Sequence, residues 1–158
     1  MRKYTITVGV ILVISSCSKD DDVSINDRKE ALFGQWEYEA IESNTAVDIN
    51  GDGTVNIDLY NTNEIRQCLK DNLTFFASRG EGEPNAFTIN ENGLSCGEVD
   101  SYENVESDRY ELINNEILHF ENRNDMLIIE FTKNQLVLEQ DDFLDDQHVV
   151  ITYTYKRS

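Results

Sequence analysis

The stretch from Val149 to Tyr155, Val-Val-Ile-Thr-Tyr-Thr-Tyr, places an apolar or aromatic side chain at every second position and two threonines between the last three of them. Successive side chains of a β-strand point to opposite faces, so a period of two predicts a strand with one face turned to a core. The face expected to turn inward carries four side chains: Val149, Ile151, Tyr153 and Tyr155. The opposite face carries the two hydroxyl side chains Thr152 and Thr154.

Seven more segments upstream show the same period, which predicts eight short strands in all. The expected strands cover residues 36–40, 73–77, 86–89, 109–113, 116–121, 127–131, 136–138 and 149–155. Asn114-Asn115 separates two of them and predicts a two-residue hairpin turn, because asparagine tolerates positive φ. Lys133-Asn134 predicts another tight turn.

The alternation also predicts which side chains of three strands face inward. The expected inward sets are Trp36, Tyr38 and Ala40; Leu73, Phe75 and Ala77; and Leu127, Ile129 and Phe131. Meandering antiparallel strands with one apolar face close into a barrel, which removes exposed edges. The predicted fold class is therefore all-β, an eight-stranded antiparallel up-and-down barrel, with a two-sheet sandwich as the alternative.

One motif gives this barrel a more specific form. Gly34-Gln35-Trp36 opens the first strand after a short helical turn at residues 27–32, and it resembles the G-x-W motif of lipocalins. Together with the small residues before Cys17, the Asp-Ile-Asn-Gly-Asp-Gly loop at residues 48–53 and the pair Cys68 and Cys96, the motif resembles the lipocalin-like domain of Bacteroidetes lipoproteins. That resemblance covers residues 32–156, and it implies a lipocalin-like barrel whose closed end is plugged by the Trp. It further implies that Gly34 allows close backbone approach, and that an Arg covers the Trp. Lys156 and Arg157 are the candidates for that Arg.

The first residues predict a lipoprotein. Two cations, Arg2 and Lys3, precede an apolar stretch at residues 4–14, which is too short to span a membrane but fits a secretory signal. Small residues then precede Cys17, and this arrangement is similar to the bacterial lipobox, in which the Cys is acylated. An ordinary cleaved signal peptide is the alternative.

The predicted organisation has three parts: a signal peptide at residues 1–16, an acylated Cys and acidic tether at 17–31, and a barrel domain at 32–158. The run Ser18-Lys19-Asp20-Asp21-Asp22 resembles the export signal of Bacteroidetes lipoproteins. That resemblance implies the outer membrane with exposure at the cell surface, and the periplasmic face is the alternative.

The charge balance excludes one class of partner. The chain has 13 Lys and Arg against 31 Asp and Glu, for a formal net charge of −18. Nucleic-acid binding requires clustered cations, so we expect no such partner. The sequence also has no nucleophile elbow and no glycine-rich phosphate loop, which favours a protein that is not an enzyme.

The loop from Asp48 to Leu59 matches the start of a calcium-binding loop. Oxygen side chains at positions 1, 3 and 5 and a glycine at position 6 are the EF-hand pattern, and it predicts a structural Ca²⁺. The expected ligands are Asp48, Asn50, Asp52, Thr54, Asn56 and Asp58. Leu59 stands where the last acidic ligand belongs, so Asp58, Glu64 or another distant acid would close the shell. A surface turn that binds no ion is the alternative.

With Cys17 acylated, Cys68 and Cys96 remain, and an even count in an oxidising compartment predicts a disulfide.

Two functions remain open on the sequence alone. The first is the binding of a small apolar ligand in the barrel. Its expected contacts are Trp36, Tyr38, Phe75, Phe87, Phe120, Phe131 and Tyr153. The second is a structural or interaction lipoprotein whose barrel is filled by side chains and whose acidic surface meets a protein partner, because eight strands enclose only a narrow interior.

Overall fold

The computed structural model describes residues 22–97, 104–144 and 147–158. The predicted acylation site, Cys17, lies outside these residues. Within them, none of the helices has the length and apolar character needed to cross a bilayer.

Nine strands and two short helices make up the described chain. The helices are α1 (Arg28–Leu32) and α2 (Gln67–Lys70). The strands are β1 (Gly34–Val47), β2 (Asn56–Asp58), β3 (Leu73–Ala77), β4 (Asn85–Asn90), β5 (Asn104–Ile113), β6 (Ile117–Phe120), β7 (Met126–Phe131), β8 (Gln135–Leu144) and β9 (Gln147–Arg157).

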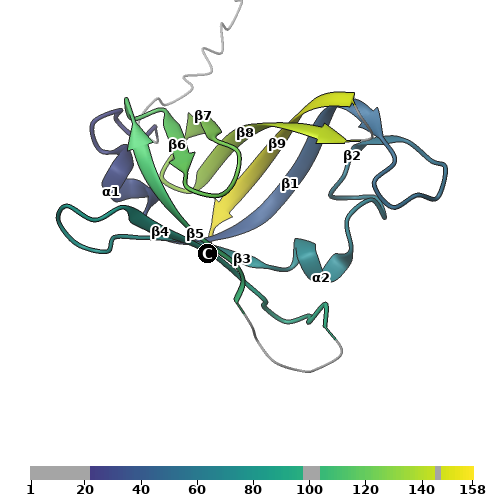
Figure 1. The fold of residues 1–158 in the computed structure, drawn as a ribbon, viewed down its shortest axis with the longest axis horizontal. Helices are drawn as coiled ribbons and strands as arrows, with labels where there is room; N and C mark the ends of the chain where they lie inside the picture. Colours follow the sequence, from purple (N-terminus) through teal and green to yellow (C-terminus); the bar gives the residue numbers. More distant parts are fainter. Residues whose placement is uncertain (1–21, 98–103, 145–146) are drawn as a thin grey trace, which may run out of the picture.

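The sheet closes on itself. Its order is β2-β1-β3-β4-β5-β6-β7-β8-β9, and β1 also pairs with β9 (Figure 1). This closing ladder is antiparallel and runs from Trp36 opposite Arg157 to Ser43 opposite Ile151. β1 and β3 to β9 therefore form a closed eight-stranded up-and-down barrel, which confirms the predicted fold class and excludes the sandwich. The short β2 was not predicted; it extends the sheet along the far part of β1.

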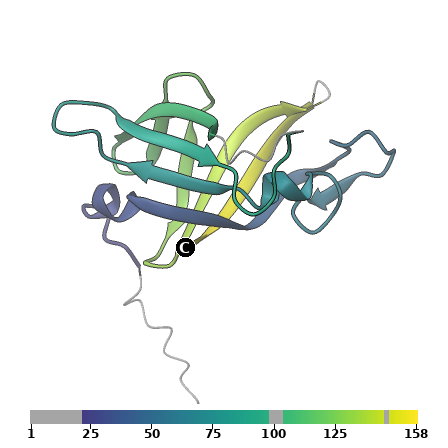
Figure 2. The ribbon, with the colours of Figure 1, turned by 90° about the horizontal axis from the view of Figure 1, so that it is seen from below.

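Because the strands are antiparallel, the connections alternate between the two ends of the barrel. We call the end with α1, the β3–β4 loop, the β5–β6 and β7–β8 turns and the C-terminus the closed end. The end with the β1–β3 connection, which contains β2 and α2, is the mouth. Figures 1 and 2 both show α1 and the β2–α2 region on opposite sides of the barrel.

Several predicted details of the strands are confirmed. Val149, Ile151 and Tyr155 of β9 are at most 6% exposed. Asn114 and Asn115 both have positive φ, at 52° and 60°, as a tight hairpin of this type requires.

The face predicted for β3 is wrong by one residue. Thr74 and Phe76 are 0% and 1% exposed, so they point into the barrel. Leu73, Phe75 and Ala77 lie on the other face of the strand. Counting apolar residues favoured that set, but the barrel instead buries a threonine together with one of the two adjacent phenylalanines.

The face predicted for β7 is wrong in part, because the strand contains an irregularity. Leu127 and Ile129 are 42% and 48% exposed, whereas Met126 and Ile128 are buried. The register with β8 shifts between Ile128 and Glu130. This bulge inserts one residue and returns Phe131 to the interior, as predicted for that residue.

Candidate functional site

The closed end is sealed by Trp36. Its side chain is 0% exposed, and its Nε1 donates to the Leu32 carbonyl at 2.9 Å. The Arg157 guanidinium lies over the indole ring, 4.3 Å from its centroid, and donates to the Ala31 and Phe33 carbonyls. The structure therefore assigns to Arg157 the covering role that the sequence left open between it and Lys156.

Gly34 is required beside this seal. Its φ is +136°, a conformation that side-chain-bearing residues rarely adopt, and a Cβ there would lie 3.0 Å from Nη1 of Arg157. The close approach expected of the glycine in Gly34-Gln35-Trp36 is thus an approach to the arginine over the Trp.

Above the seal, the barrel is filled by aromatic rings in edge-to-face contact. Phe76 contacts Phe87 with centroids 5.3 Å apart, and Tyr110 at 5.4 Å. Phe87 contacts Phe120 at 5.1 Å. These side chains are at most 3% exposed, so this half of the interior leaves no room for a ligand beside them.

The half toward the mouth differs, because two tyrosines there are only partly buried. Tyr38 of β1 and Tyr153 of β9 point inward, with ring centroids 6.1 Å apart, and both keep part of their surface accessible. Yet protein surrounds them, and burial raises the pKa of each hydroxyl. Tyr38 and Tyr153 are therefore inward side chains that retain some accessible surface.

Arg123, from the β6–β7 loop, lies between these two halves. Its guanidinium lies 4.8 Å from the centroid of Phe87 and 5.1 Å from that of Phe120, and its side chain is 17% exposed. It pairs with Glu106 at 3.1 Å and donates to Gln140 at 3.2 Å. Its buried Nε has no hydrogen-bond partner among the described residues. Sequence reasoning missed Arg123; the only signal was a single cation in the polar loop between two strands.

The rim of the mouth is cross-linked. The predicted disulfide joins Cys68 of α2 to Cys96 in the β4–β5 connection. Nearby, the Leu94 amide donates to Asp71 at 2.9 Å. Lys70 is 8% exposed and donates to the carbonyls of the segment that follows β2. These contacts hold the loops around the mouth in one arrangement.

The predicted calcium loop is folded by its own acidic side chains. Asp48 accepts from the amides of Gly51, Asp52 and Gly53 at 2.8–3.1 Å, and Asp52 accepts from the Thr54 amide at 2.8 Å. In the described part of the chain no three His, Cys, Asp or Glu side chains converge on one point. An ion here would therefore depend on amide and backbone oxygens as well.

Of the two acids considered for closing the shell, Glu64 is the one that reaches the loop. It is 4% exposed and accepts from the amides of Ile49 and Asn50 and from Nδ2 of Asn56 at 2.6 Å. Asp58 instead accepts from the backbone of Tyr60 and Asn61, in its own turn.

We predict from this geometry that calcium affinity depends on Glu64 and not on Asp58. Glu64→Gln is expected to weaken binding by about tenfold or more, because it removes one charge from a hard-cation shell, whereas Asp58→Asn leaves affinity nearly unchanged. Isothermal titration with Ca²⁺ measures both. If the unaltered protein binds no Ca²⁺ at millimolar concentration, the calcium prediction is wrong and the loop is a surface turn that binds no ion.

A second prediction concerns Tyr110, which is 1% exposed and whose hydroxyl has no hydrogen-bond partner among the described residues. Burial raises its pKa. Its contribution to stability is thus fully present below the unfolded pKa of about 10 and is lost as pH rises from there toward the folded pKa. Tyr110→Phe is expected to raise the free energy of unfolding at pH 7 by up to about 1–3 kcal/mol, because it removes a buried hydroxyl without a partner, and to reduce the alkaline loss by about 1.4 kcal/mol per pH unit. Urea denaturation at pH 7 and at several values above 10 measures this, and an equal alkaline loss in both proteins would contradict it.

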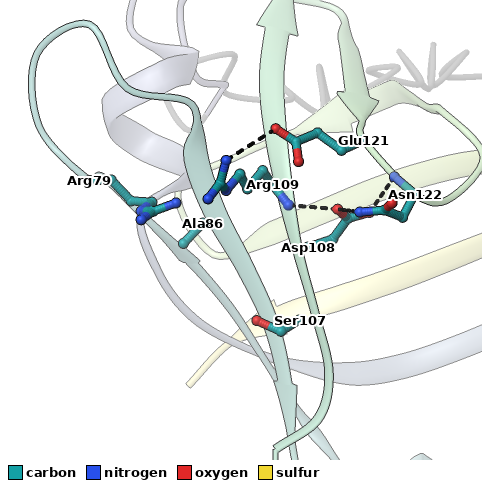
Figure 3. Close-up of a pocket in the computed structure, with 7 residues that line it drawn as sticks. All are labelled: Arg79, Ala86, Ser107, Asp108, Arg109, Glu121 and Asn122. Atoms are coloured by element: carbon teal, nitrogen blue, oxygen red, sulfur yellow. Dashed lines mark hydrogen bonds and ion pairs between the residues drawn. The ribbon is translucent and has the colours of Figure 1, made fainter.

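The outer wall carries an open hollow of about 580 Å³ beside β4 and β5 (Figure 3). Arg109 pairs there with Glu121 at 3.6 Å, and both side chains are about half exposed. Asp108 accepts from the backbone and side chain of Asn122. Burial by itself would raise the pKa of Asp108, but these bonds and the Arg109 amide outweigh it and lower the pKa. In this hollow Arg109 is therefore paired with Glu121, and Asp108 with Asn122.

Both histidines lie on the outer surface. His119 is 2.9 Å from Asp125, and His148 is 3.2 Å from Asp141, with all four side chains about half exposed or more.

The residues predicted to contact a ligand fall into three groups. Trp36, Phe87, Phe120 and Phe131 form the filled half of the interior. Phe75 lies on the other face of β3. Tyr38 and Tyr153 are the two that line the mouth.

No family model matches the chain, and no curated protein matches it. Among solved structures it is similar to the siderocalin Ex-FABP, with 13% identity over 81% of this chain and 74% of that one, at a TM-score of 0.48. It is similar to bovine odorant binding protein in complex with a selenium-containing odorant, with 14% identity over 82% and 72% and a TM-score of 0.45. For lobster apocrustacyanin A1 the identity is 12% over 89% and 72%, and the TM-score is 0.43.

Proposed function

We propose that this protein is a lipid-anchored lipoprotein of the outer membrane, exposed at the cell surface, that binds a small ligand in the mouth of its barrel and performs no catalysis. Cys17 carries the anchor, and the membrane is reached through it. One observation supports ligand binding above the others: Tyr38 and Tyr153 point inward yet remain partly accessible.

The mouth suits a ligand with an apolar body and one polar group. The rings of Tyr38 and Tyr153 provide the apolar wall, together with the neighbouring aliphatic cluster that contains Ile41 and Ile151. The polar group would meet Arg123, whose Nε is buried without an acceptor among the described residues. A buried donor left unpaired costs about 1–3 kcal/mol, so a ligand acceptor that reaches it gains affinity.

Titration of the chain from Ser18 onward with the apolar fluorophore 1-N-phenylnaphthylamine tests this proposal. We expect saturable binding, and we expect Tyr153→Trp to weaken it by about tenfold, because a larger ring intrudes on the space that the fluorophore fills.

Thr152→Trp is the matched control. It places the same ring on the outer face of the same strand, beside its partners Glu42 and Glu139, and should leave the affinity unchanged. Equal weakening by both variants would locate the fluorophore elsewhere. No binding at all would favour the alternative function, an interaction lipoprotein with a filled barrel.

A further inference from the structure

The point where the tether enters the barrel is fixed by hydrogen bonds. Asp22 forms a β-bridge with Thr132, and the Val23 amide donates to the Phe131 carbonyl at 2.9 Å. Phe131 is the last residue of β7, and Thr132 begins the turn to β8. The tether therefore joins the barrel at the closed end.

The tether is short compared with the barrel. From Cys17 to Asp22 there are five residues, which span at most about 18 Å when fully extended. β8 has 10 residues, and the nine steps between them, at about 3.3 Å each and a tilt of about 40°, advance roughly 23 Å along the barrel axis. An anchor on Cys17 thus cannot reach past the barrel to the plane of the mouth.

We infer that the closed end faces the bilayer and that the mouth opens away from it. The inference rests on the proposed acylation of Cys17. It also decides where a ligand comes from: the ligand enters from the aqueous side and not laterally from the lipid.

The distribution of charge favours the same orientation. The described connections at the mouth carry eight acidic and three cationic side chains: Asp48, Asp52, Asp58, Glu64, Asp71, Glu91, Glu121 and Asp125 against Arg66, Lys70 and Arg123. The described N-terminal segment and the connections at the closed end carry six acidic and four cationic side chains: Asp22, Asp27, Glu30, Glu81, Glu83 and Glu116 against Arg28, Lys29, Arg79 and Lys133. An anionic membrane surface repels the mouth more strongly than the closed end.

Fluorescence quenching on vesicles tests the orientation. The full acylated protein is labelled with a fluorophore at a single added cysteine and reconstituted into phosphatidylcholine vesicles that contain a lipid with a nitroxide on its headgroup. Asn134→Cys reports the closed end, in the β7–β8 turn, and Val55→Cys reports the mouth side, where the side chain is 60% exposed. We expect headgroup quenching at position 134 to be at least about twice that at position 55, since only position 134 lies within the reach of the tether.

The outcomes separate the inference from the proposed anchoring. Equal quenching at both positions, or stronger quenching at 55, on protein that stays with the vesicles would overturn the orientation and leave the anchor intact. If the protein fails to remain with the vesicles, and Cys17→Ser behaves identically, the anchor itself is refuted and the orientation with it.

Discussion

Trp36→Ala is expected to lower the free energy of unfolding by about 3–5 kcal/mol, the range for deleting a buried Trp or Phe. The indole is 0% exposed, stacks edge-on against Phe131 with centroids 5.9 Å apart, and supports the guanidinium of Arg157. Its removal leaves a cavity and a cation without its aromatic platform. Because Trp36 is the only tryptophan, urea denaturation is followed by circular dichroism.

Phe143→Ala is the control for this substitution. Phe143 is 71% exposed, so truncating it should change stability by about 0.5 kcal/mol or less. A loss smaller than about 1.5 kcal/mol for Trp36→Ala would mean that the closed end is not sealed as described, because even a well-collapsed large-to-small change in a core costs more.

Removing the disulfide is expected to cost about 3.5 kcal/mol. Cys68 and Cys96 are separated by 28 positions, and closing a loop of that length restricts the unfolded chain by about this amount on the chain-entropy model. The comparison is between the oxidised protein and the double variant Cys68→Ala/Cys96→Ala, each unfolded in urea.

A reducing agent provides the matched control for the disulfide. It should lower the stability of the unaltered protein to that of the double variant and leave the double variant unchanged. Stability that is independent of the reductant in both proteins would show that the bridge does not form.

The closed barrel could be predicted from the sequence because several of its strands show a clear two-residue alternation of side-chain type. In β9 threonine alternates with apolar or aromatic residues from Ile151 to Tyr155, and Asn114-Asn115 marks a tight turn by its tolerance of positive φ. The resemblance carried by Gly34-Gln35-Trp36 further implied the seal, but only the fold identifies Arg157 as its cover.

The inward faces of β3 and β7 were predicted wrongly because these strands lack a two-residue alternation of apolar and polar side chains. Met126 to Ile129 is an uninterrupted apolar run, so alternation cannot say which side chains face inward, and the bulge before Glu130 is a property of pairing with β8. In β3, adjacent phenylalanines at 75 and 76 make both faces apolar.

The position of Arg123 at the mouth could not be predicted from the sequence for a different reason. Arg123 is held by Phe87, Phe120, Glu106 and Gln140, which come from four different strands. Contacts of that kind leave no spacing pattern in the chain. The same is true of Glu64, which meets the calcium loop from 15 residues beyond Ile49.

The central claim is that the mouth of the barrel holds a small ligand, and native mass spectrometry of the oxidised chain from Ser18 tests it most directly. The protein is incubated with an extract of outer-membrane and medium components, separated from excess, and measured intact. We expect a non-covalent adduct of several hundred daltons at one copy per chain, reduced by Tyr153→Trp and retained by Thr152→Trp. A protein that emerges at its bare mass after every such incubation would contradict the claim and favour a filled barrel that acts through its surface.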